Sequence, residues 1–308
     1  LRDGNGINIQ PIAGGVSGQS QFFAEGVKKY IDADGFITGT EIADIKKETD
    51  DYMIPPNMLA ITNALGNGIR LTAGVQLDYD GDLTLMEKWD FVDWRYNEGT
   101  GLASLPGSLS LNATGNIALN ASISDGFKDG FIYLDIVEVK DLLQTGDSWS
   151  YQVTAGSDLS AADRLATNAD KNLVLGSNVS VRTGSGDIKL ASGGDIKLTD
   201  DTSTVYTAGK PTETARYGTL HQQAVGFTLY GEYPVEGGDV LLQAGKNIQG
   251  AITSQFISPW LVRQGSWTNN IHQPTAWAVA LGYTNFVGNA ADSSAPLFKQ
   301  NVGSFGGG

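Results

Sequence analysis

The fold is decided by the stretch Gly186-Asp187-Ile188-Lys189-Leu190-Ala191-Ser192-Gly193-Gly194-Asp195-Ile196-Lys197-Leu198, in which one phrase occurs twice, eight residues apart. The phrase is a Gly, then an Asp or Asn, then apolar residues at alternate positions. A period of two is that of a β-strand with one buried face. Eight residues fit a strand of about five residues and a tight turn. The stretch therefore predicts two short strands joined by a turn.

The same phrase recurs along the chain. Further copies begin at Gly81, Gly107, Gly115 and Gly238. Most copies open with Gly-Asp or Gly-Asn rather than with the Asn-Gly or Asp-Gly pairs of two-residue hairpins. The turns favour coils of about 20 residues that stack on one another, the period of a β-helix. We therefore predict a mainly β chain that forms a parallel β-helix, or solenoid.

The composition of the 308 residues excludes several classes of protein. The 40 glycines are typical of many short strands and turns, since glycine adopts positive φ at no steric cost. The net charge of −14 argues against nucleic acid as a partner, because such a partner is bound through Lys and Arg. The chain has no cysteine, so disulfides, thiolate metal sites and cysteine catalysis are absent. No apolar run is long enough for a transmembrane helix.

The N-terminal part has a different pattern. Apolar residues three and four apart predict two short helices, over Phe22–Ile31 and over Thr40–Tyr52, with Thr38 or Thr40 before Glu41 as the start of the second helix. Pro55-Pro56 is expected to end this helical excursion. The predicted organisation is an N-terminal coil edge with two helices over residues 1–56, and a β-helix over 57–308. Irregular flanking loops are expected at about 202–237 and 254–299.

Several phrases also resemble those of a known family. They are Asp93-Trp94-Arg95-Tyr96, the stretch from Gly107 to Phe127, Ser148-Trp149-Ser150-Tyr151 with Ala155-Gly156-Ser157-Asp158-Leu159, the stretch from Val181 to Gly209, and the closing Gln300 to Gly308. In their order they resemble the filamentous haemagglutinin family of bacterial exoproteins, over about residues 57 to 308. The resemblance implies a right-handed parallel β-helix, export with an outer-membrane transporter as the partner, and a role in adhesion, aggregation or matrix.

One acidic turn is a candidate metal site. Asp32, Asp34, Gly35, Ile37 and Glu41 match the third, fifth, sixth, eighth and twelfth positions of a calcium loop. The first position is Tyr30, which cannot supply the carboxylate that a calcium loop has there. Asp32, Asp34 and Glu41 are therefore candidate Ca²⁺ ligands. The alternative is an acidic turn that joins two helices and caps the second.

A second acidic turn, Asp78 to Asp82, has carboxylates on alternate residues. Two of them would share one face of a strand, which allows ion binding. The alternative is a solvated turn.

Aromatic residues suggest a ligand surface. Trp260, Trp267 and Trp277 lie in a Gly- and Asn-rich stretch. They could form a platform for sugar rings, or anchor a loop as buried side chains.

Catalysis is poorly supported by the sequence. His221 and His272 are its two histidines, and neither lies beside a plausible nucleophile or acid. Asp200-Asp201 is an adjacent acid pair of the kind that a polysaccharide-cleaving β-helix could use. The Gly-His-Gly and Arg-Xaa-Lys phrases of pectin-degrading enzymes are missing, however, so closing a turn is the favoured explanation of the pair. We predict no catalytic residue and no cofactor other than Ca²⁺.

These features together predict a structural or adhesive segment of a secreted bacterial surface filament, cut from a longer protein. Its expected partners are copies of itself or neighbouring coils, because a solenoid exposes unpaired strand edges at its ends. The alternative is a carbohydrate-binding or polysaccharide-cleaving β-helix protein, with a surface glycan as its partner.

Overall fold

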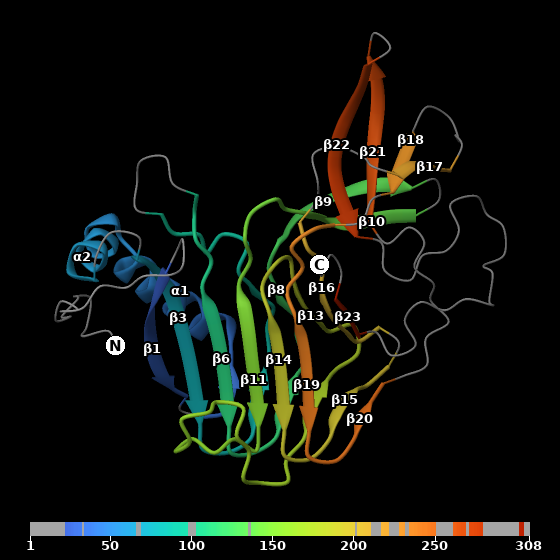
Figure 1. Cartoon of the computed structure of the whole chain (residues 1–308). Helices are drawn as coiled ribbons and strands as arrows, with labels where there is room; N and C mark the ends of the chain where they lie inside the picture. Colours follow the sequence, from blue (N-terminus) through green and yellow to red (C-terminus); the bar gives the residue numbers. More distant parts are fainter. Residues whose placement is uncertain are drawn as a thin grey trace.

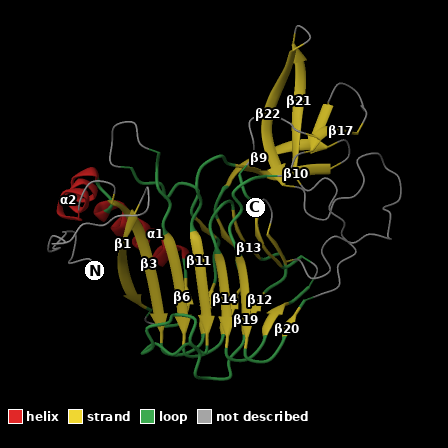
Figure 2. Cartoon of the chain, viewed as in Figure 1, coloured by secondary structure: helices red, strands yellow, loops and turns green. Residues whose placement is uncertain are grey.

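The protein is mainly β, with helices gathered at one end (Figures 1 and 2). The computed structural model describes residues 22–32, 34–65, 69–97, 103–134, 137–200, 202–210, 217–221, 228–231, 234–250, 261–268, 271–279 and 302–304. Within these residues there are two helices, α1 (Gly39–Tyr52) and α2 (Pro55–Leu65). Neither is long and apolar enough to cross a membrane.

Three parallel sheets make up the body of the molecule. The first sheet contains β1 (Phe22–Ile31), β3 (Ile69–Tyr79), β6 (Ser108–Ala113), β11 (Ser150–Ala155), β14 (Ile188–Ser192) and β19 (Val240–Ala244). The second contains β2 (Phe36–Ile37), β4 (Leu83–Leu85), β7 (Ile117–Leu119), β12 (Leu173–Leu175), β15 (Ile196–Leu198) and β20 (Ile248–Gln249). The third contains β5 (Trp89–Asp90), β8 (Ile123–Ser124), β13 (Ser180–Thr183), β16 (Thr204–Thr207) and β23 (Val302–Ser304). These sheets confirm the prediction of a mainly β chain with parallel sheets.

The chain visits the three sheets in turn, which explains the repeated phrase. The copy at Gly186 leads into β14 of the first sheet, and the copy at Gly194 leads into β15 of the second. Equivalent residues then pair between successive visits: Tyr151 of β11 lies between Leu109 of β6 and Ile188 of β14. We call one passage of the chain through the sheets, from a strand of the first sheet to the next strand of that sheet, a coil. The alternate apolar residues point inward, and most are fully buried in one continuous core.

Successive coils have unequal lengths. Leu173 pairs with Ile196, 23 residues later, which is close to the predicted coil of about 20 residues. Other coils are longer: Asn116 and Asn172 occupy equivalent places although they are 56 residues apart. The extra residues leave the coil and return to the same register, because the buried strands are aligned by their neighbours and not by the connecting loops.

The N-terminal segment corrects one prediction. Phe22–Ile31 forms strand β1, which pairs in parallel with β3, and not a helix. Phe23 and Ile31, expected on the apolar face of a helix, are 55% and 79% exposed. Gly26 faces the core instead, where an added Cβ would lie 2.7 Å from the Tyr52 ring.

The second predicted helix is confirmed as α1, and it begins after Thr38. Pro55 does not end the helical segment, however, because it is the first residue of α2, where a missing N–H has no consequence. Ile45 and Tyr52 of α1, together with Met58 and Ile61 of α2, are buried in the core. The helices therefore cover the end of the core next to β1 and β3 (Figure 1).

A separate antiparallel sheet corrects the prediction of irregular flanking loops (Figure 1). It contains β9 (Phe127–Leu134), β10 (Val137–Leu143), β17 (Tyr217–His221), β18 (Thr228–Gly231), β21 (Leu261–Thr268) and β22 (Ile271–Val279). Four of these strands fall in the two segments expected to be loops. The first of those segments also contains β16, which belongs to the third parallel sheet.

The two ends of the core differ. At the end away from the helices, Ile196 of β15 is fully buried, whereas its partner Ile248 of β20 is 43% exposed. Val240 and Leu242 of β19 are likewise half-buried, although their partners in β14 are fully buried. Within the described residues the last coil is therefore incompletely covered. We call this the open end.

Candidate functional site

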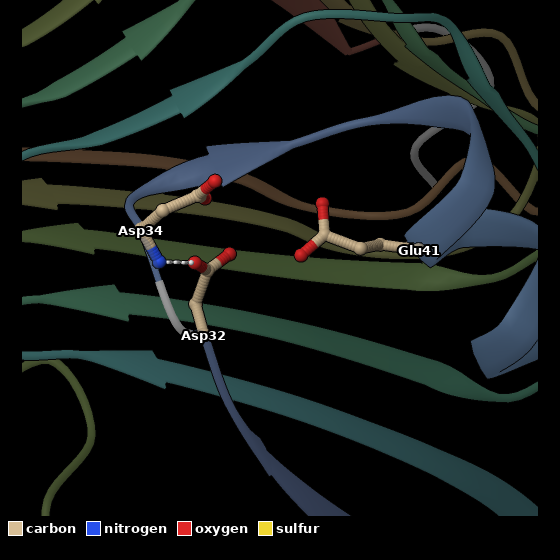
Figure 3. Close-up of side chains that lie close together, drawn as sticks. All are labelled: Asp32, Asp34 and Glu41. Carbon is tan, nitrogen blue, oxygen red and sulfur yellow. Dashed lines mark hydrogen bonds between the residues drawn. The ribbon is translucent and has the colours of Figure 1, made fainter.

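The predicted metal ligands come together where β1 passes into β2 and α1 (Figure 3). Asp32 follows β1, Asp34 lies in the turn before β2, and Glu41 lies in the first turn of α1. One carboxylate oxygen from each lies within 4.8 Å of the other two. We call these three residues the acidic loop. It is the only such group of metal-ligating side chains among the described residues.

Local hydrogen bonds give the acidic loop its shape. Asp32 Oδ1 accepts hydrogen bonds from the backbone N–H groups of Asp34 (2.9 Å) and Gly35 (2.8 Å). Gly35 has φ +83°, a conformation that favours glycine. Ile37 then enters the core, fully buried. These are the backbone turn and buried apolar residue that the spacing predicts.

Glu41 also caps α1. Its Oε2 accepts a hydrogen bond from the Thr38 N–H (2.8 Å), and the Thr38 hydroxyl accepts one from the Glu41 N–H, which completes a capping box. The capping alternative is thus present, but it leads from a strand into a helix. The Glu41 side chain thus takes part both in the cap of α1 and in the cluster of carboxylates.

The second acidic turn gathers no metal-ligating cluster among the described residues. Asp78 is buried, and its Oδ2 lies 2.7 Å from Lys29 Nζ. Burial raises the pKa of Asp78, but hydrogen bonds from Lys29, Gln76 and Asn112 outweigh it and lower the pKa overall. The other two carboxylates of this turn also accept hydrogen bonds: Asp80 from the Thr114 hydroxyl and Asp82 from the Asn116 N–H, both in the next coil.

The predicted aromatic platform remains a prediction. Trp267 lies on β21 and Trp277 on β22, two neighbouring antiparallel strands, and Trp260 lies outside the described residues. The histidines lie in the same sheet, His221 on β17 and His272 on β22, which pairs His272 with Trp267.

Asp200 lies in the turn between β15 of the second sheet and β16 of the third. It accepts hydrogen bonds from the hydroxyls of Ser177 and Thr202, and these bonds lower its pKa to about 2. Its neighbour Asp201 lies outside the described residues. An acid held this firmly in its ionised form is unsuited to donate a proton in polysaccharide cleavage near neutral pH.

A groove of about 600 Å³ runs beside the starts of the strands of the first sheet. Its polar lining includes Glu25, Ser108, Ser150, Asp187, Lys210 and Asp239. Burial raises the pKa of Glu25, and nearby Arg164 lowers it in part. Lys210 forms ion pairs with Asp147 and Glu236. The groove thus offers hydroxyl groups, carboxylates and one lysine. We did not predict it from the sequence.

A ladder of Asp and Asn side chains joins the coils, and it too was not predicted. Asn116 Oδ1 accepts a hydrogen bond from the Asn172 N–H (2.9 Å), and Asn172 Oδ1 accepts one from the Asp195 N–H (2.7 Å). Asp82 and Asn247 continue the ladder in either direction. The signal was visible in the sequence, because most of these residues are the second residue of the repeated phrase.

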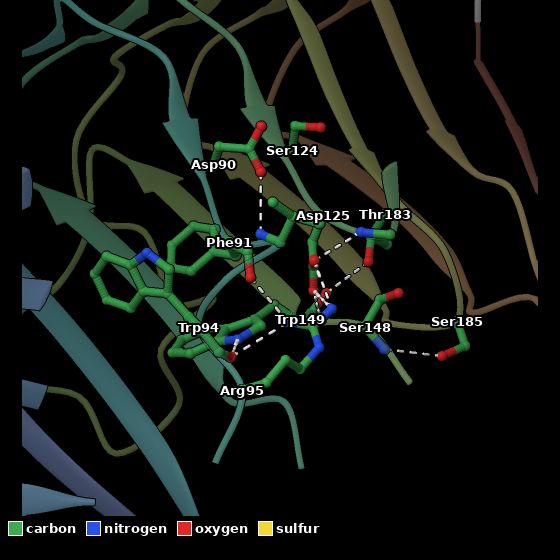
Figure 4. Close-up of polar contacts among 12 residues, drawn as sticks. Asp90, Phe91, Trp94, Arg95, Ser124, Asp125, Ser148, Trp149, Thr183 and Ser185 are labelled. Carbon is green, nitrogen blue, oxygen red and sulfur yellow. Dashed lines mark hydrogen bonds and ion pairs between the residues drawn. The ribbon is translucent and has the colours of Figure 1, made fainter. Parts of the chain in front are cut away.

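A buried ion pair anchors the aromatic part of the core (Figure 4). Asp125 is fully buried, and its carboxylate lies 2.6 Å from an Arg95 nitrogen and accepts a hydrogen bond from the Trp149 N–H (2.6 Å). The Trp149 ring stacks on Phe91, with centroids 4.5 Å apart, and meets the edge of Trp94 at 5.6 Å. These contacts join three of the phrases that carry the family resemblance.

Comparison of the chain with protein-family models, with curated proteins and with solved structures gives no match in any of the three. The resemblance to filamentous haemagglutinin exoproteins therefore rests on the quoted phrases alone.

Proposed function

We propose that the chain is a structural and adhesive segment of a secreted bacterial surface filament, and not an enzyme. In this proposal the three parallel sheets are the walls of a right-handed parallel β-helix. The order in which the chain visits the sheets supports such a rod. Right-handed crossovers between parallel strands are the general rule, and they agree with the handedness that the family resemblance implies.

The open end is the observation that carries the proposal. Inward-facing Ile248 is 43% exposed, whereas Ile196 one coil earlier is fully buried. Exposed edge strands pair readily with further chain. Helices α1 and α2, which we call the helical cap, cover the opposite end of the core, so growth of the filament has a direction. We propose that further coils, or another copy of the chain, cover the open end.

Location at the bacterial surface follows from the family resemblance, as does export through an outer-membrane transporter. The net charge of −14 supports this setting, because an acidic rod stays soluble and repels unspecific contacts. The Asp and Asn ladder supports the same role, since it adds hydrogen bonds between coils at the surface of the rod.

Sedimentation velocity of the purified 308-residue chain at rising concentration tests this proposal. We expect association that grows with concentration, and rods in negative-stain electron micrographs. Ile248→Lys places a charge at the open end and should leave the chain monomeric. Met86→Lys is the matched control, because Met86 is 48% exposed but lies away from the open end. A chain that stays monomeric at every concentration would contradict self-association.

The groove beside the first sheet favours a second candidate function, which is glycan binding. Serine hydroxyls and carboxylates are suited to the hydroxyl groups of a sugar chain. A glycan array tests it with two variants: binding lost in Glu25→Gln but kept in Trp267→Ala would assign the sugar to the groove. The reverse result would assign it to the antiparallel sheet, and release of new reducing ends would contradict the non-enzymatic proposal.

A further inference from the structure

We propose that the acidic loop binds one Ca²⁺ ion, and that this ion ties the β1–β2 turn to the helix that covers the end of the core. The ligands are Asp32, Asp34 and Glu41. Their spacing, the positive φ of Gly35 and the burial of Ile37 are the features of a calcium loop that leads into a helix. Here the loop follows a strand.

A buried oxygen without a partner points to the ligand. Asp32 is 8% exposed, and its Oδ1 accepts two backbone hydrogen bonds. Its Oδ2 is buried and has no hydrogen-bond partner among the described residues. Figure 3 shows this second oxygen directed toward the Glu41 carboxylate. A buried carboxylate oxygen is costly unless a donor or a cation satisfies it.

The charges of the acidic loop lead to the same conclusion. Three carboxylates meet within 4.8 Å, and like charges at this range repel. None of the ion pairs between described residues involves Asp32, Asp34 or Glu41. A divalent cation would remove the repulsion and satisfy Asp32 Oδ2 at once.

The chemistry of the donors selects calcium. Every side-chain donor is a carboxylate oxygen, the ligand that a hard cation prefers. Ca²⁺ takes six to eight oxygens in a flexible geometry, whereas Mg²⁺ demands a near-ideal octahedron. The Phe36 carbonyl stands at the position where a calcium loop supplies a backbone oxygen. The carbonyls on either side of it accept hydrogen bonds from the next coil, Gly35 from Thr84 of β4 and Ile37 from Met86 directly after β4. The Phe36 carbonyl is therefore directed away from β4.

The proposed ion acts on the helical cap. Glu41 belongs to the first turn of α1, and Asp32 belongs to the end of β1. α1 buries Ile45 and Tyr52 against the core, so an ion held by both elements fixes the cap to the first sheet. Removing the ion should loosen α1 before it affects the middle coils.

Calcium titration of the EGTA-treated 308-residue chain tests the proposal. We expect one Ca²⁺ per chain by isothermal titration calorimetry, a higher Tm with Ca²⁺, and slower hydrogen exchange in α1. Glu41→Gln is the decisive variant, because Gln at this position keeps the capping box but loses the charge. It should weaken Ca²⁺ binding by more than about tenfold, and the ion-free variant should be at least as stable as the ion-free unmodified chain, because one of the repelling charges is gone.

Asp32→Asn provides a second variant with the same expected loss of binding. Asp44→Asn is the matched control, since Asp44 is an exposed acid of the same helix outside the acidic loop. This variant should bind Ca²⁺ as the unmodified chain does. Absence of binding up to about 1 mM Ca²⁺, the weak limit for extracellular calcium modules, would overturn the site. Unchanged binding in Glu41→Gln would do the same, and equal affinity for Mg²⁺ would overturn the choice of ion.

Discussion

At the level of single residues, long-range contacts of charged side chains hold the coils together. Asp125 receives hydrogen bonds from Arg95, 30 residues earlier, and from Trp149, 24 residues later. Burial raises the pKa of Asp125, and the neighbouring Arg95 guanidinium and the backbone N–H groups of Trp149 and Gly126 counteract this in part. The carboxylate is thus the acceptor that Arg95 and the Trp149 N–H share, while the other Arg95 nitrogen donates to the carbonyls of Phe91 and Trp94.

Asp125→Ala should destabilise the protein by about 3 kcal/mol, because it leaves Arg95 and the Trp149 N–H without their acceptor. Chemical denaturation gives this free energy of unfolding. Asp93→Ala is the control, since Asp93 is exposed in the same segment as Arg95 and its loss should change stability little. Equal effects of the two substitutions would show that the buried ion pair has no special role.

Asp200 should make stability fall in acid. Hydrogen bonds from Ser177 and Thr202 lower its pKa from 3.8 to about 2, so its contribution is complete above pH 3.8 and is lost as the pH falls through about 2. Asp200→Asn cannot titrate, so its stability should change less between pH 4 and pH 2 than that of the unmodified chain. Denaturation curves at both pH values measure the difference, and identical pH dependence would refute it.

The acidic loop was predictable because all its parts lie within ten residues of one another. Their spacing alone predicted that the carboxylates of Asp32, Asp34 and Glu41 come together around the turn at Gly35. The partners of Asp125 were not predictable in this way. They lie in different coils, and only the register of those coils brings them together.

At the level of elements, close contact between coils explains the glycines of the repeated phrase. A Cβ on Gly186 would overlap the carbonyl oxygen of Trp149, and one on Gly238 would overlap the carbonyl oxygen of Gly186. Of the phrase glycines, Gly81 alone has positive φ among the described residues. We expected these glycines for their freedom to adopt positive φ, but at most of the positions the close approach of the neighbouring coil is the reason for glycine.

Gly186→Ala should destabilise the protein by about 1–3 kcal/mol, because the methyl group forces β14 away from the preceding coil. Gly146→Ala is a matched control, since an added Cβ there meets no atom within 4 Å. Thermal unfolding of both variants provides the measurement. A Gly186→Ala variant as stable as Gly146→Ala would mean that the coils can separate without cost.

The strand β1 shows where local pattern is insufficient. Phe23, Val27 and Ile31 have helical spacing, yet ten residues of pairing with β3 and contact with Tyr52 impose an extended chain. In contrast, α1 was predicted correctly because its capping box and its amphipathic face are both local. Tertiary pairing overrides a weak helical pattern when an edge strand is available.

At the level of the whole molecule, alternation of apolar residues predicted short strands, and the Gly-Asp and Gly-Asn turns between them predicted parallel sheets. Coil length was predicted only approximately, because insertions separate some phrases that are neighbours in space. The antiparallel sheet was missed for a related reason. Its strands come from three distant segments, and they carry no copy of the repeated phrase.

The unequal coils also have a practical consequence for protein engineering. After the excursion through β9 and β10, the chain re-enters the first sheet at β11 with Tyr151 aligned on Leu109, as if nothing had been added. Such a junction is a natural place to graft an epitope or a foreign domain. A rod with several of these junctions could display different cargoes at fixed intervals along a single scaffold.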